Sequence, residues 1–380
     1  MRFRELAVVC VTQAALALAQ IPPIDAPIQT QYTAKIADIR IGTGPLAEAG
    51  KTLVFNATIW QVDGKKISST YDRGVPISFE KGSRKVVPGL DAGFEGMRVG
   101  GKRRLFIPYQ LSTGEKGGSK MDLVYDIELL DVRDPRTLRK ATAVAGAHYQ
   151  GISADQATGS PAIAAESLVA AYDMATLTAD GRLRDFSGKA NHGIVQKTEV
   201  VPGLFGQARR FAAVTDRIAL SSTQALDIDG PLSVAVWVRL NRGGLHQHVL
   251  ACDDKFALWF TEDNKIRFVD STGHGFQSDD AFALGQWHSI AGVFRGTKGD
   301  AVTADNLTVF VDGQELAGNR FGKWSPGKLH PSEACYLGFE SHQGLEDHKS
   351  LLFAGDVDEV LVFARPLSDA EVGAHAARTH

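Results

Sequence analysis

The sequence has little net charge, few cysteines and no long apolar run. Its 380 residues carry 41 Lys and Arg against 44 Asp and Glu, so the formal net charge is only -3. Nothing in this balance attracts a polyanion, and we set nucleic acid aside. No segment approaches the roughly eighteen apolar residues of a spanning helix, so we expect no membrane span. The 44% of hydrophobic residues still supports packed cores, and the length favours two domains.

The N-terminus has the pattern of an export leader. Two arginines precede an apolar run over residues 6–18 that ends in small residues. We therefore predict a signal peptide over residues 1–19, cleaved between Ala19 and Gln20, and a mature protein that is periplasmic or secreted. A valine precedes Cys10 where a lipobox needs a small residue, which argues against lipidation.

Removal of this leader leaves Cys252 and Cys335 as the cysteines of the mature chain. Two cysteines in an exported protein can form one disulfide bond. They can equally be two separate buried apolar side chains, so both alternatives stay open.

The character of the sequence changes along the chain. Residues 20–35 contain three prolines and no period, which predicts an extended arm. Residues 36–133 consist of short strands around glycine-rich turns. Residues 134–167 are rich in Ala, Gly, Ser and charge, so we expect a linker with a short helix over 135–144.

Residues 168–380 contain runs of strand length separated by Gly, Asp, Asn and Pro. These runs are LSVAVWVRL, KFALWF, KIRFVD, WHSIAGVF, LTVFVDG, ACYLGFE and DVDEVLVFARPL. In the first run Val234, Val236 and Val238 alternate with Trp237, so both faces are apolar, as in a central strand. Their spacing predicts an antiparallel β-sandwich.

Four segments of the first domain carry a family pattern in order and spacing. They are GTG at 42–44, DGKKISSTYDRGVPISF at 63–79, VVPGLDAGFEGMRVGGKRRLFIP at 86–108 and LVYDIELLDV at 123–132. Residues 36–133 thus resemble the FKBP-type peptidyl-prolyl cis-trans isomerases. The resemblance implies an α+β fold, a twisted antiparallel sheet wrapped on one short helix, here expected over residues 89–97. Leu90, Phe94 and Met97 would share the apolar face of that helix.

Catalysis in this family needs neither a nucleophile nor a cofactor. Rotation about an X-Pro bond crosses a barrier of ~18–20 kcal/mol because amide resonance is lost in the twisted state. An apolar, water-poor pocket that holds the proline ring favours this state. The resemblance therefore implies proline-containing polypeptides as substrates.

The family's pocket positions can be carried over one by one. The positions that this resemblance assigns to the site are Arg73, Phe79, Val86, Val87, Leu90, Tyr125 and Ile67. Other positions depart from the family pattern: its first tyrosine is Ala57, its Phe-Asp pair is Ile67-Ser68, its tryptophan is Leu90 and its late tyrosine is Thr113. The flap is shortened to residues 115–122. Two functions follow: a folding assistant with isomerase activity, or a non-catalytic binding protein of the cell envelope with a degenerate pocket.

Seven segments of the second domain carry another pattern. They are AAYDM, LRDFSGKANHGIV at 183–195, GQARRF, LSVAVWVRL, GQWHSIAGVF, LTVFVDGQEL and FAGDVDEVLVFARPLSDAEV. Residues 168–380 resemble the laminin-G-like or concanavalin A-like sandwiches, which implies an all-β jelly roll and a glycan or protein ligand.

A calcium ion is one interpretation of the acidic loops of this domain. Oxygens of Asp185, Ser187 and Asn191 could surround a hard cation, and Asp358 could come near them. The alternative is that the loop forms an Asx turn closed by its own backbone, and that Asp358 pairs locally.

Glycoside hydrolysis is disfavoured, because no strand carries the alternating acidic pair that it needs. The acidic residues that come closest to such a pair are Asp356, Asp358 and Glu359. The histidines at 246, 248, 342 and 348 lack ligand spacing, so we interpret them as solvated loop residues. Trp259, Trp287 and Trp324 could stack on sugars, although Trp287 is expected in the core.

Overall fold

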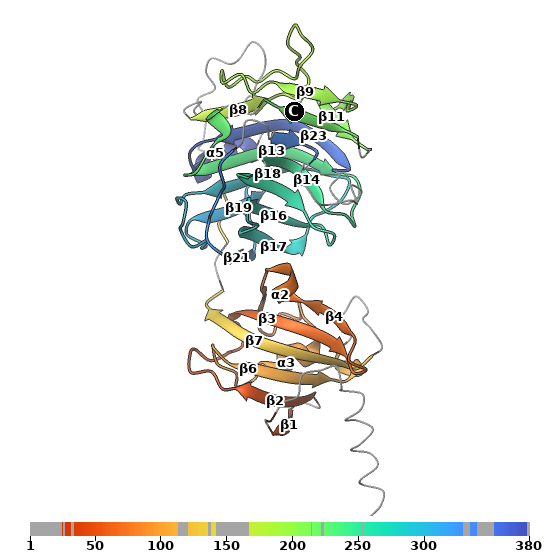
Figure 1. Ribbon diagram of the computed structural model, residues 1–380, viewed down its shortest axis with the longest axis vertical. Coiled ribbons are helices and arrows are strands. Elements are labelled where there is room, and N and C mark those ends of the chain that lie inside the picture. Colours follow the sequence, from red (N-terminus) through yellow and green to blue (C-terminus); the bar gives the residue numbers. More distant parts are fainter. Residues whose placement is uncertain are drawn as a thin grey trace, which may run out of the picture. The chain divides into compact units, whose positions relative to one another are not determined.

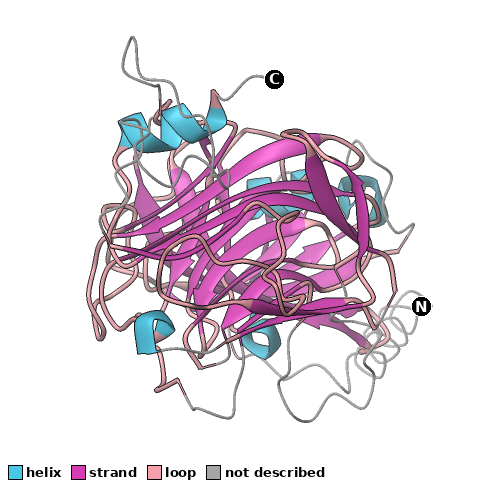
Figure 2. Cartoon of the chain, turned by 90° about the horizontal axis from the view of Figure 1, so that it is seen from above, coloured by secondary structure: helices cyan, strands magenta, loops and turns pink. Residues whose placement is uncertain are grey.

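The computed structural model describes residues 25, 27–31, 34–112, 121–135, 138–141, 167–213, 215–221, 224–252, 254–329, 335–339 and 353–377. Its contacts divide the chain into two units, Met1–Thr137 and Leu138–His380. Antiparallel strands dominate both units (Figures 1 and 2). In these ranges no helix is long and apolar enough to cross a membrane.

The N-terminal unit is a seven-stranded antiparallel sheet in the order β1-β2-β6-β7-β3-β4, with β5 also paired to β3 (Figure 1). The strands are β1 Ile28–Gln31, β2 Ala34–Arg40, β3 Thr52–Gln61, β4 Lys66–Ser69, β5 Ile77–Glu80, β6 Lys102–Ile107 and β7 Leu123–Arg133. The helices are α2 Thr70–Arg73, α3 Pro88–Gly93 and α4 Tyr109–Ser112. Strand β1 lies inside the predicted arm, residues 20–35. This part of the arm is a sheet strand because its backbone pairs with β2.

Helix α3 is shorter than the sequence predicts. The amides of Phe94 and Met97 donate to the carbonyls of Asp91 (3.3 Å) and Phe94 (3.0 Å), so tight turns follow the helix. Gly96 then takes φ 69°, the left-handed region that ends a helix. Leu90, Phe94 and Met97 are nonetheless buried, as their spacing predicts.

The C-terminal unit is a sandwich of two eight-stranded sheets. The first sheet contains β8 Leu168–Tyr172, β10 Glu199–Pro202, β11 Gln207–Phe211, β13 Leu232–Leu240, β18 Trp287–Phe294, β19 Leu307–Val311, β20 Gln314–Glu315 and β23 Gly355–Phe363. The second contains β9 Gly193–Gln196, β12 Arg217–Leu220, β14 Gln247–Cys252, β15 Phe256–Phe260, β16 Lys265–Asp270, β17 Gly275–Ala281, β21 Gly318–Phe321 and β22 Cys335–Leu337. A 3₁₀ turn, Gln224–Leu226, and helix α5, Asp369–Ala376, complete the unit.

The central position predicted for β13 is confirmed. It lies between β23 and β18. Its residues Val234, Val236 and Val238 belong to the main core, whereas Ala235 belongs to a second cluster that contains Val372 of α5. This strand therefore contributes apolar side chains to clusters on both of its faces.

The predicted linker is partly docked on the sandwich. Lys140 forms a bridge with Gln314, and the Ala141 amide donates to the Gly313 carbonyl (2.7 Å). The guanidinium of Arg139 pairs with the buried Glu315 carboxylate (3.0 Å). The short helix predicted over 135–144 is wrong for the described residues 138–141, because these contacts hold their backbone extended.

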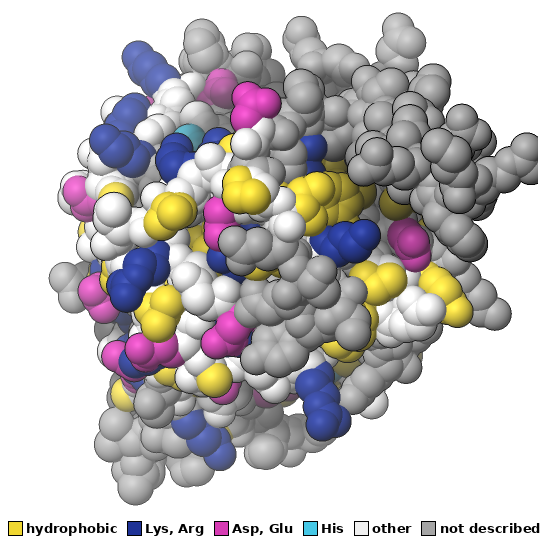
Figure 3. Space-filling model, turned by 90° about the horizontal axis from the view of Figure 1, so that it is seen from below, with side chains coloured by type: hydrophobic (Ala, Val, Ile, Leu, Met, Phe, Trp, Pro, Cys, Tyr) yellow, Lys and Arg dark blue, Asp and Glu magenta, His cyan; other side chains and the backbone are white. Residues whose placement is uncertain are grey.

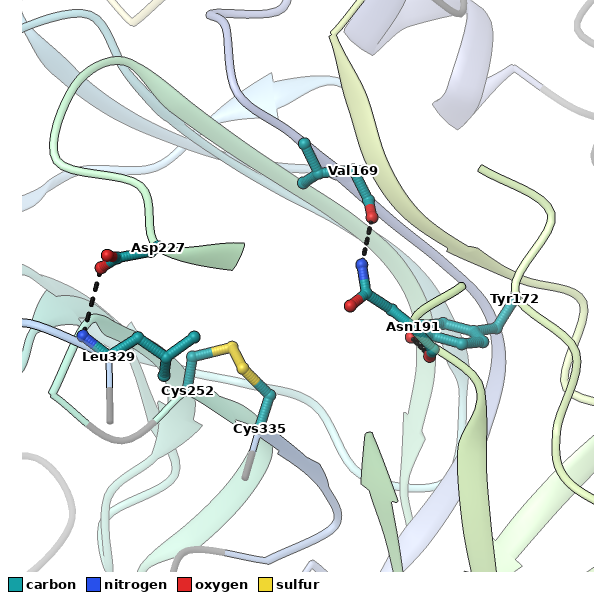
Figure 4. The surroundings of a disulfide bond; sticks show 7 residues. All are labelled: Val169, Tyr172, Asn191, Asp227, Cys252, Leu329 and Cys335. Carbon is teal, nitrogen blue, oxygen red and sulfur yellow. Dashed lines mark hydrogen bonds between the residues drawn. A yellow bond between two sulfur atoms is a disulfide. The ribbon is translucent and has the colours of Figure 1, made fainter. Parts of the chain in front are cut away.

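The disulfide alternative is the one that the structure contains. Cys252 and Cys335 are directly opposite each other on β14 and β22 and are bonded (Figure 4). Beside them the buried ammonium of Lys255 pairs with Asp227 and Asp229, 2.6 Å from each. The bond therefore fixes a pair of central strands that the core also buries.

Asp356 is a buried carboxylate that joins three strands of the first sheet. It accepts from Arg210 of β11 (2.8 Å) and from Arg239 of β13 (2.6 Å), and Asn241 donates to it as well (3.1 Å). Burial alone would raise the pKa of Asp356. The hydrogen bonds from Arg210, Asn241 and Arg239 outweigh burial and hold this pKa below the usual aspartate value.

We predict that Asp356→Asn lowers the free energy of unfolding by about 3 kcal/mol at pH 7, because it removes the buried carboxylate that pairs with both Arg210 and Arg239. The folded-state pKa of Asp356 lies below its unfolded value. Its contribution is therefore complete above the unfolded pKa and is lost as pH falls through the folded pKa. Urea denaturation at pH 7 and pH 3, followed by tryptophan fluorescence, measures both effects, with the exposed Asp305→Asn as control. An equal loss at the two pH values would contradict the assignment.

Candidate functional site

Helix α3 lies unusually close to strand β6. A Cβ at Gly89 would stand 2.4 Å from Ile107, and one at Gly93 would stand 2.5 Å from Leu105. The buried Arg103 of β6 donates to the carbonyls of Gly93 and Glu95, 2.8 Å each, at the end of the helix. Glycine and arginine together fix α3 against the sheet, and the start of α3 therefore has a defined position.

An apolar surface surrounds the start of α3. Val87 is its N-cap and Leu90 lies in its first turn. Leu90 and Tyr125 belong to one cluster of buried side chains, and Val86, Val87 and Ile59 pack against this cluster while remaining half-buried. Ile59 of β3 is opposite Tyr125 of β7. With Phe79, which belongs to the same cluster, five of the predicted site residues contribute to it.

Phe79 lies deeper than the predicted pocket requires. It is 2% exposed and packs against Phe55 (5.9 Å between ring centroids) and Phe94 (5.6 Å). Ile77, two residues earlier on β5, is half-buried and packs against the same cluster. Sequence reasoning missed Ile77, although the alternation in ISF places it on the same face as Phe79.

Helix α2 is fixed to the sheet by a charged network. The Tyr71 hydroxyl donates to Glu128 (2.7 Å), which also accepts from Arg40 (2.8 Å). Burial, followed by the hydrogen bond to Glu128, raises the pKa of Tyr71 to about 12. Of the predicted site residues in this region, Arg73 ends α2 and Ile67 of β4 is 48% exposed.

The positions that depart from the family pattern have different fates. Ala57 is buried in β3, and its amide donates to the Thr70 hydroxyl (3.0 Å). Thr113 and most of the flap lie outside the described residues. The described ends of that loop are joined, because the Tyr109 amide donates to the Asp122 carboxylate (2.8 Å).

Tyr125 provides a hydroxyl on this otherwise apolar surface. Its side chain is 7% exposed, and burial raises its pKa, so the phenol is neutral at physiological pH. Within the described ranges no hydrogen bond joins this hydroxyl to another residue, whereas the Tyr71 hydroxyl is bonded to Glu128. Tyr125 can therefore offer a hydrogen bond to a bound peptide.

In the sandwich, Asp185 and Asn191 are held by local hydrogen bonds. The Asp185 carboxylate accepts from the amides of Ala171 (3.0 Å), Ser187 (2.9 Å) and Asn191 (2.9 Å). The Asn191 side chain donates to the Val169 carbonyl (2.7 Å; Figure 4). These are the contacts of the Asx-turn alternative.

Asp358 closes a different turn. It accepts from the amides of Leu204 (2.7 Å) and Phe205 (3.0 Å). Its neighbour Glu359 lies 3.6 Å from the buried His375, so both acids have local partners. In the described parts of the chain, no three His, Cys, Asp or Glu side chains form a group that could hold a metal ion. Calcium at Asp185, Asn191 and Asp358 stays a prediction.

Three of the aromatic and histidine predictions need correction. His248 is not a solvated loop residue: it belongs to β14, is 4% exposed and stacks on the Trp259 ring (5.1 Å). Trp324 is 1% exposed and cannot stack on a ligand. Trp287 is only half-buried, with the Arg239 guanidinium over its ring (5.0 Å). His342 and His348 lie outside the described residues.

The comparisons with known proteins separate the same two domains. The model of the FKBP-type peptidyl-prolyl cis-trans isomerases matches residues 44–130. An FK506-binding protein of Neisseria meningitidis serogroup A is 36% identical over 102 residues, which are 26% of this chain and 94% of that protein. The chain belongs to the FKBP family. An FK506-binding protein of Streptomyces anulatus is 40% identical over 83 residues, 22% of this chain and 67% of that protein.

Other relatives share only the FKBP domain. FK506-binding protein 4 of Aspergillus oryzae is 37% identical over 105 residues, 26% of this chain, and the chain spans about a fifth of its length (22%). The crystal structure of FkpA from Escherichia coli is 28% identical and covers 34% of this chain and 61% of that chain, with a TM-score of 0.28.

The model of the concanavalin A-like lectin/glucanases superfamily matches residues 212–373. Domain 4 of AbnA, an extracellular arabinanase from Geobacillus stearothermophilus, solved in complex with arabinotriose, is 17% identical. It covers 55% of this chain and 98% of that domain, with a TM-score of 0.41. The chain is therefore multidomain, with an α+β FKBP domain followed by an all-β concanavalin A-like sandwich.

We predict that Asp185→Ala destabilises the sandwich to the same extent with and without EDTA. The carboxylate accepts from backbone amides of β8 and of its own loop, so its loss leaves these donors unsatisfied and costs about 1–3 kcal/mol. Thermal unfolding with calcium or with EDTA measures this effect, with Asp305→Ala as the exposed control. If EDTA destabilises the native protein but not the variant, Asp185 is a calcium ligand instead.

Proposed function

We propose that the protein is an exported peptidyl-prolyl cis-trans isomerase and folding assistant, whose sandwich binds a glycan or protein client. The observation that carries the proposal is the apolar surface of Val86, Val87, Leu90 and Tyr125 around the fixed start of α3. A proline ring fits an apolar surface, and a twisted amide needs shielding from water rather than a reacting side chain. Proline-containing polypeptides are the substrates, and the reaction requires no cofactor.

The fold supports catalysis through geometry. Because α3 is held by Gly89, Gly93 and Arg103, the side chains of Val87 and Leu90 keep their positions when a peptide binds. A preformed site spends little binding free energy on ordering itself. The Tyr125 hydroxyl has no hydrogen-bond partner among the described residues, and it supplies a polar contact that orients the peptide.

A non-catalytic binding protein of the cell envelope is the second candidate. Ala57 and Leu90 replace larger aromatic residues of the family pattern, and the smaller side chains shield a twisted amide less well. Such a domain would bind proline-containing peptides without accelerating their isomerisation. Turnover therefore decides between the two functions.

Export is supported by the bond between Cys252 and Cys335, since structural disulfides persist in oxidising compartments. The apolar run over residues 6–18 is consistent with this location. On this proposal the mature protein is periplasmic or secreted, and its first residue, read by mass spectrometry, is Gln20.

We predict that Val87→Glu abolishes isomerisation. A charge at the N-cap of α3 hydrates the apolar surface and must itself be desolvated when a peptide binds. In the full-length protein we expect kcat/KM for a short X-Pro peptide, measured by NMR exchange, to fall at least about tenfold.

The matched control is Val62→Glu, which places the same charge at an exposed position of the same domain. We expect this variant to retain the native rate. Native protein that binds the peptide without accelerating exchange would overturn the isomerase and favour the second candidate.

We predict that Tyr125→Phe raises KM for the peptide severalfold and changes kcat less. The substitution removes one hydrogen bond to the substrate, worth about 0.5–1.5 kcal/mol, and keeps the apolar ring. Because the hydroxyl has no bonding partner among the described residues, the melting temperature should not change. An unchanged KM, or a large loss of stability, would show that this hydroxyl has a structural role.

A further inference from the structure

A row of polar and aromatic side chains crosses the second sheet of the sandwich. His248 of β14 is opposite Trp259 of β15, Trp259 is opposite Arg267 of β16, Arg267 is opposite Gln277 of β17, and Gln277 is opposite Asn319 of β21. We call these five residues the β14–β21 row. Four strand spacings of about 4.8 Å give it a width of about 19 Å.

The row lies on the face of the sheet that points away from the main core. The neighbours Leu258, Phe268 and Phe276, on β15, β16 and β17, all belong to that core. Since side chains alternate along a strand, Trp259, Arg267 and Gln277 point to the opposite face. All three are half-buried, so this face is partly open to solvent.

Arg267 is held between two aromatic rings. The centre of its guanidinium is 4.9 Å from the Trp259 ring and 5.2 Å from the Phe321 ring. One of its terminal nitrogens donates to the Gly273 carbonyl (2.8 Å), whereas Nε is buried and has no hydrogen-bond partner. Two aromatic planes and one backbone contact therefore fix the orientation of this cation.

No carboxylate in the described part of the chain compensates the charge of Arg267. No ion pair joins it to a carboxylate among the described residues, whereas Arg320 on the adjacent β21 pairs with Glu315 (3.4 Å) and Arg239 pairs with Asp356 (2.6 Å). Burial is the cause that lowers the pKa of Arg267 to about 10. A cation that is removed from water without a counter-ion raises the free energy of the folded state, and an anionic ligand would reverse that cost.

The rest of the row determines what kind of anion fits. Trp259 is stacked on the rings of His246 (5.2 Å) and His248 (5.1 Å), which fix its position beside Arg267. The exposed carboxylate of Glu262 lies near His246 (3.7 Å) and repels an anion there, so the anionic group belongs at Arg267. Gln277 and Asn319 carry amides, which donate to and accept from hydroxyl groups.

We propose that the β14–β21 row binds an acidic saccharide, with the carboxylate of one sugar unit on Arg267 and the hydroxyl groups of adjoining units on Gln277 and Asn319. Guanidinium groups match the geometry of carboxylates. An acidic peptide fits less well, because peptides gain affinity from main-chain hydrogen bonds at a strand edge, and the row presents side chains on a sheet face. This inference rests on the proposed role of the sandwich as the ligand-binding domain and narrows its client to a uronic-acid-containing glycan.

The test uses the full-length protein and tetrasaccharides of galacturonate, glucuronate-containing hyaluronan and mannuronate, with calorimetry at low and high salt. We expect at least one of them to bind. Its carboxyl-methyl ester should bind at least about tenfold more weakly, because the ester has no charge to place on Arg267. This comparison requires no protein variant and does not depend on the folding of a mutant.

Arg267→Gln should reduce affinity for the acid at least about tenfold and leave affinity for the ester unchanged, whereas Arg267→Lys should retain part of the affinity for the acid. Both variants should keep the native isomerisation rate of an X-Pro peptide, which separates failure at this row from failure of the isomerase. The proposal is overturned if none of the acids binds, if acid and ester bind equally, or if poly-glutamate binds as tightly as the best saccharide. Binding of a neutral glycan alone would keep the sandwich as a glycan-binding domain while excluding this role of Arg267.

Discussion

A charged side chain that is buried needs an opposite charge or hydrogen bonds to compensate the loss of water. Within each domain this requirement helps to position central elements: α3 in the FKBP domain, and β11, β13 and β23 in the sandwich. Arg103 pairs with Asp38 (2.6 Å) while it donates to two carbonyls at the end of α3. In the sandwich, Asp356 ties β11 and β13 to β23 through Arg210 and Arg239. Each of these buried groups forms hydrogen bonds to segments far apart in the sequence. The contacts that compensate its charge therefore also hold the elements of its domain together. Against this background the charge of Arg267, which pairs with no carboxylate of the described ranges, points to a ligand.

Compensation of the buried Arg103 also explains how the FKBP domain can keep an apolar surface partly exposed. Arg103 donates a hydrogen bond to the end of α3, and Gly89 and Gly93 let the helix pack closely against β6. The position of the helix therefore does not depend on full burial of Val86 and Val87. Hydrophobic side chains also reach the surface between charged ones on the face shown in Figure 3. The surface at the start of α3 differs from these side chains because it belongs to a helix with a fixed position. A preformed apolar site loses little conformational entropy when it binds a ligand.

Local patterns in the sequence predicted the strands, the helix and the buried faces of both domains. Contacts between residues far apart in the sequence determined which side chains lie at the site, and no local pattern predicts them. The spacing of Leu90, Phe94 and Met97 and the alternation in β13 predicted buried faces correctly, because burial follows period. The helix predicted over 135–144 is wrong at the described residues 138–141, because Arg139 pairs with a buried carboxylate 176 residues further along the chain. The roles of Phe79 and Ile77 could not be separated, since both occupy the same face of β5 and only the third dimension shows which of them Phe55 and Phe94 cover.

Asp185 and Arg267 show the same limit for charged residues. The sequence leaves Asp185 as either a calcium ligand or the acceptor of an Asx turn, and in the structure its oxygens accept from nearby backbone amides. The run KIRFVD predicts a strand but not the surroundings of Arg267, which two rings enclose. The type of a residue tells which hydrogen bonds and ion pairs it can form. Only the structure shows how many of these are already formed within the protein. By this count the acidic loop is satisfied and the arginine is not.

The two proposed sites complement each other energetically. On the proposed function, a site with Ala57 and Leu90 in place of larger aromatic residues would make fewer contacts with a peptide, and its affinity for an isolated proline would be correspondingly low. If the sandwich holds a glycan carried by the same client or matrix, prolyl bonds are presented to the FKBP domain at an effective concentration that linkage can raise to about the millimolar range. Weak binding of the peptide would then no longer limit how often a prolyl bond reaches the FKBP domain, and it would favour release of the peptide after each isomerisation. A proline site of low affinity on a tethered domain would therefore suit the proposed action on many prolines of one client in succession.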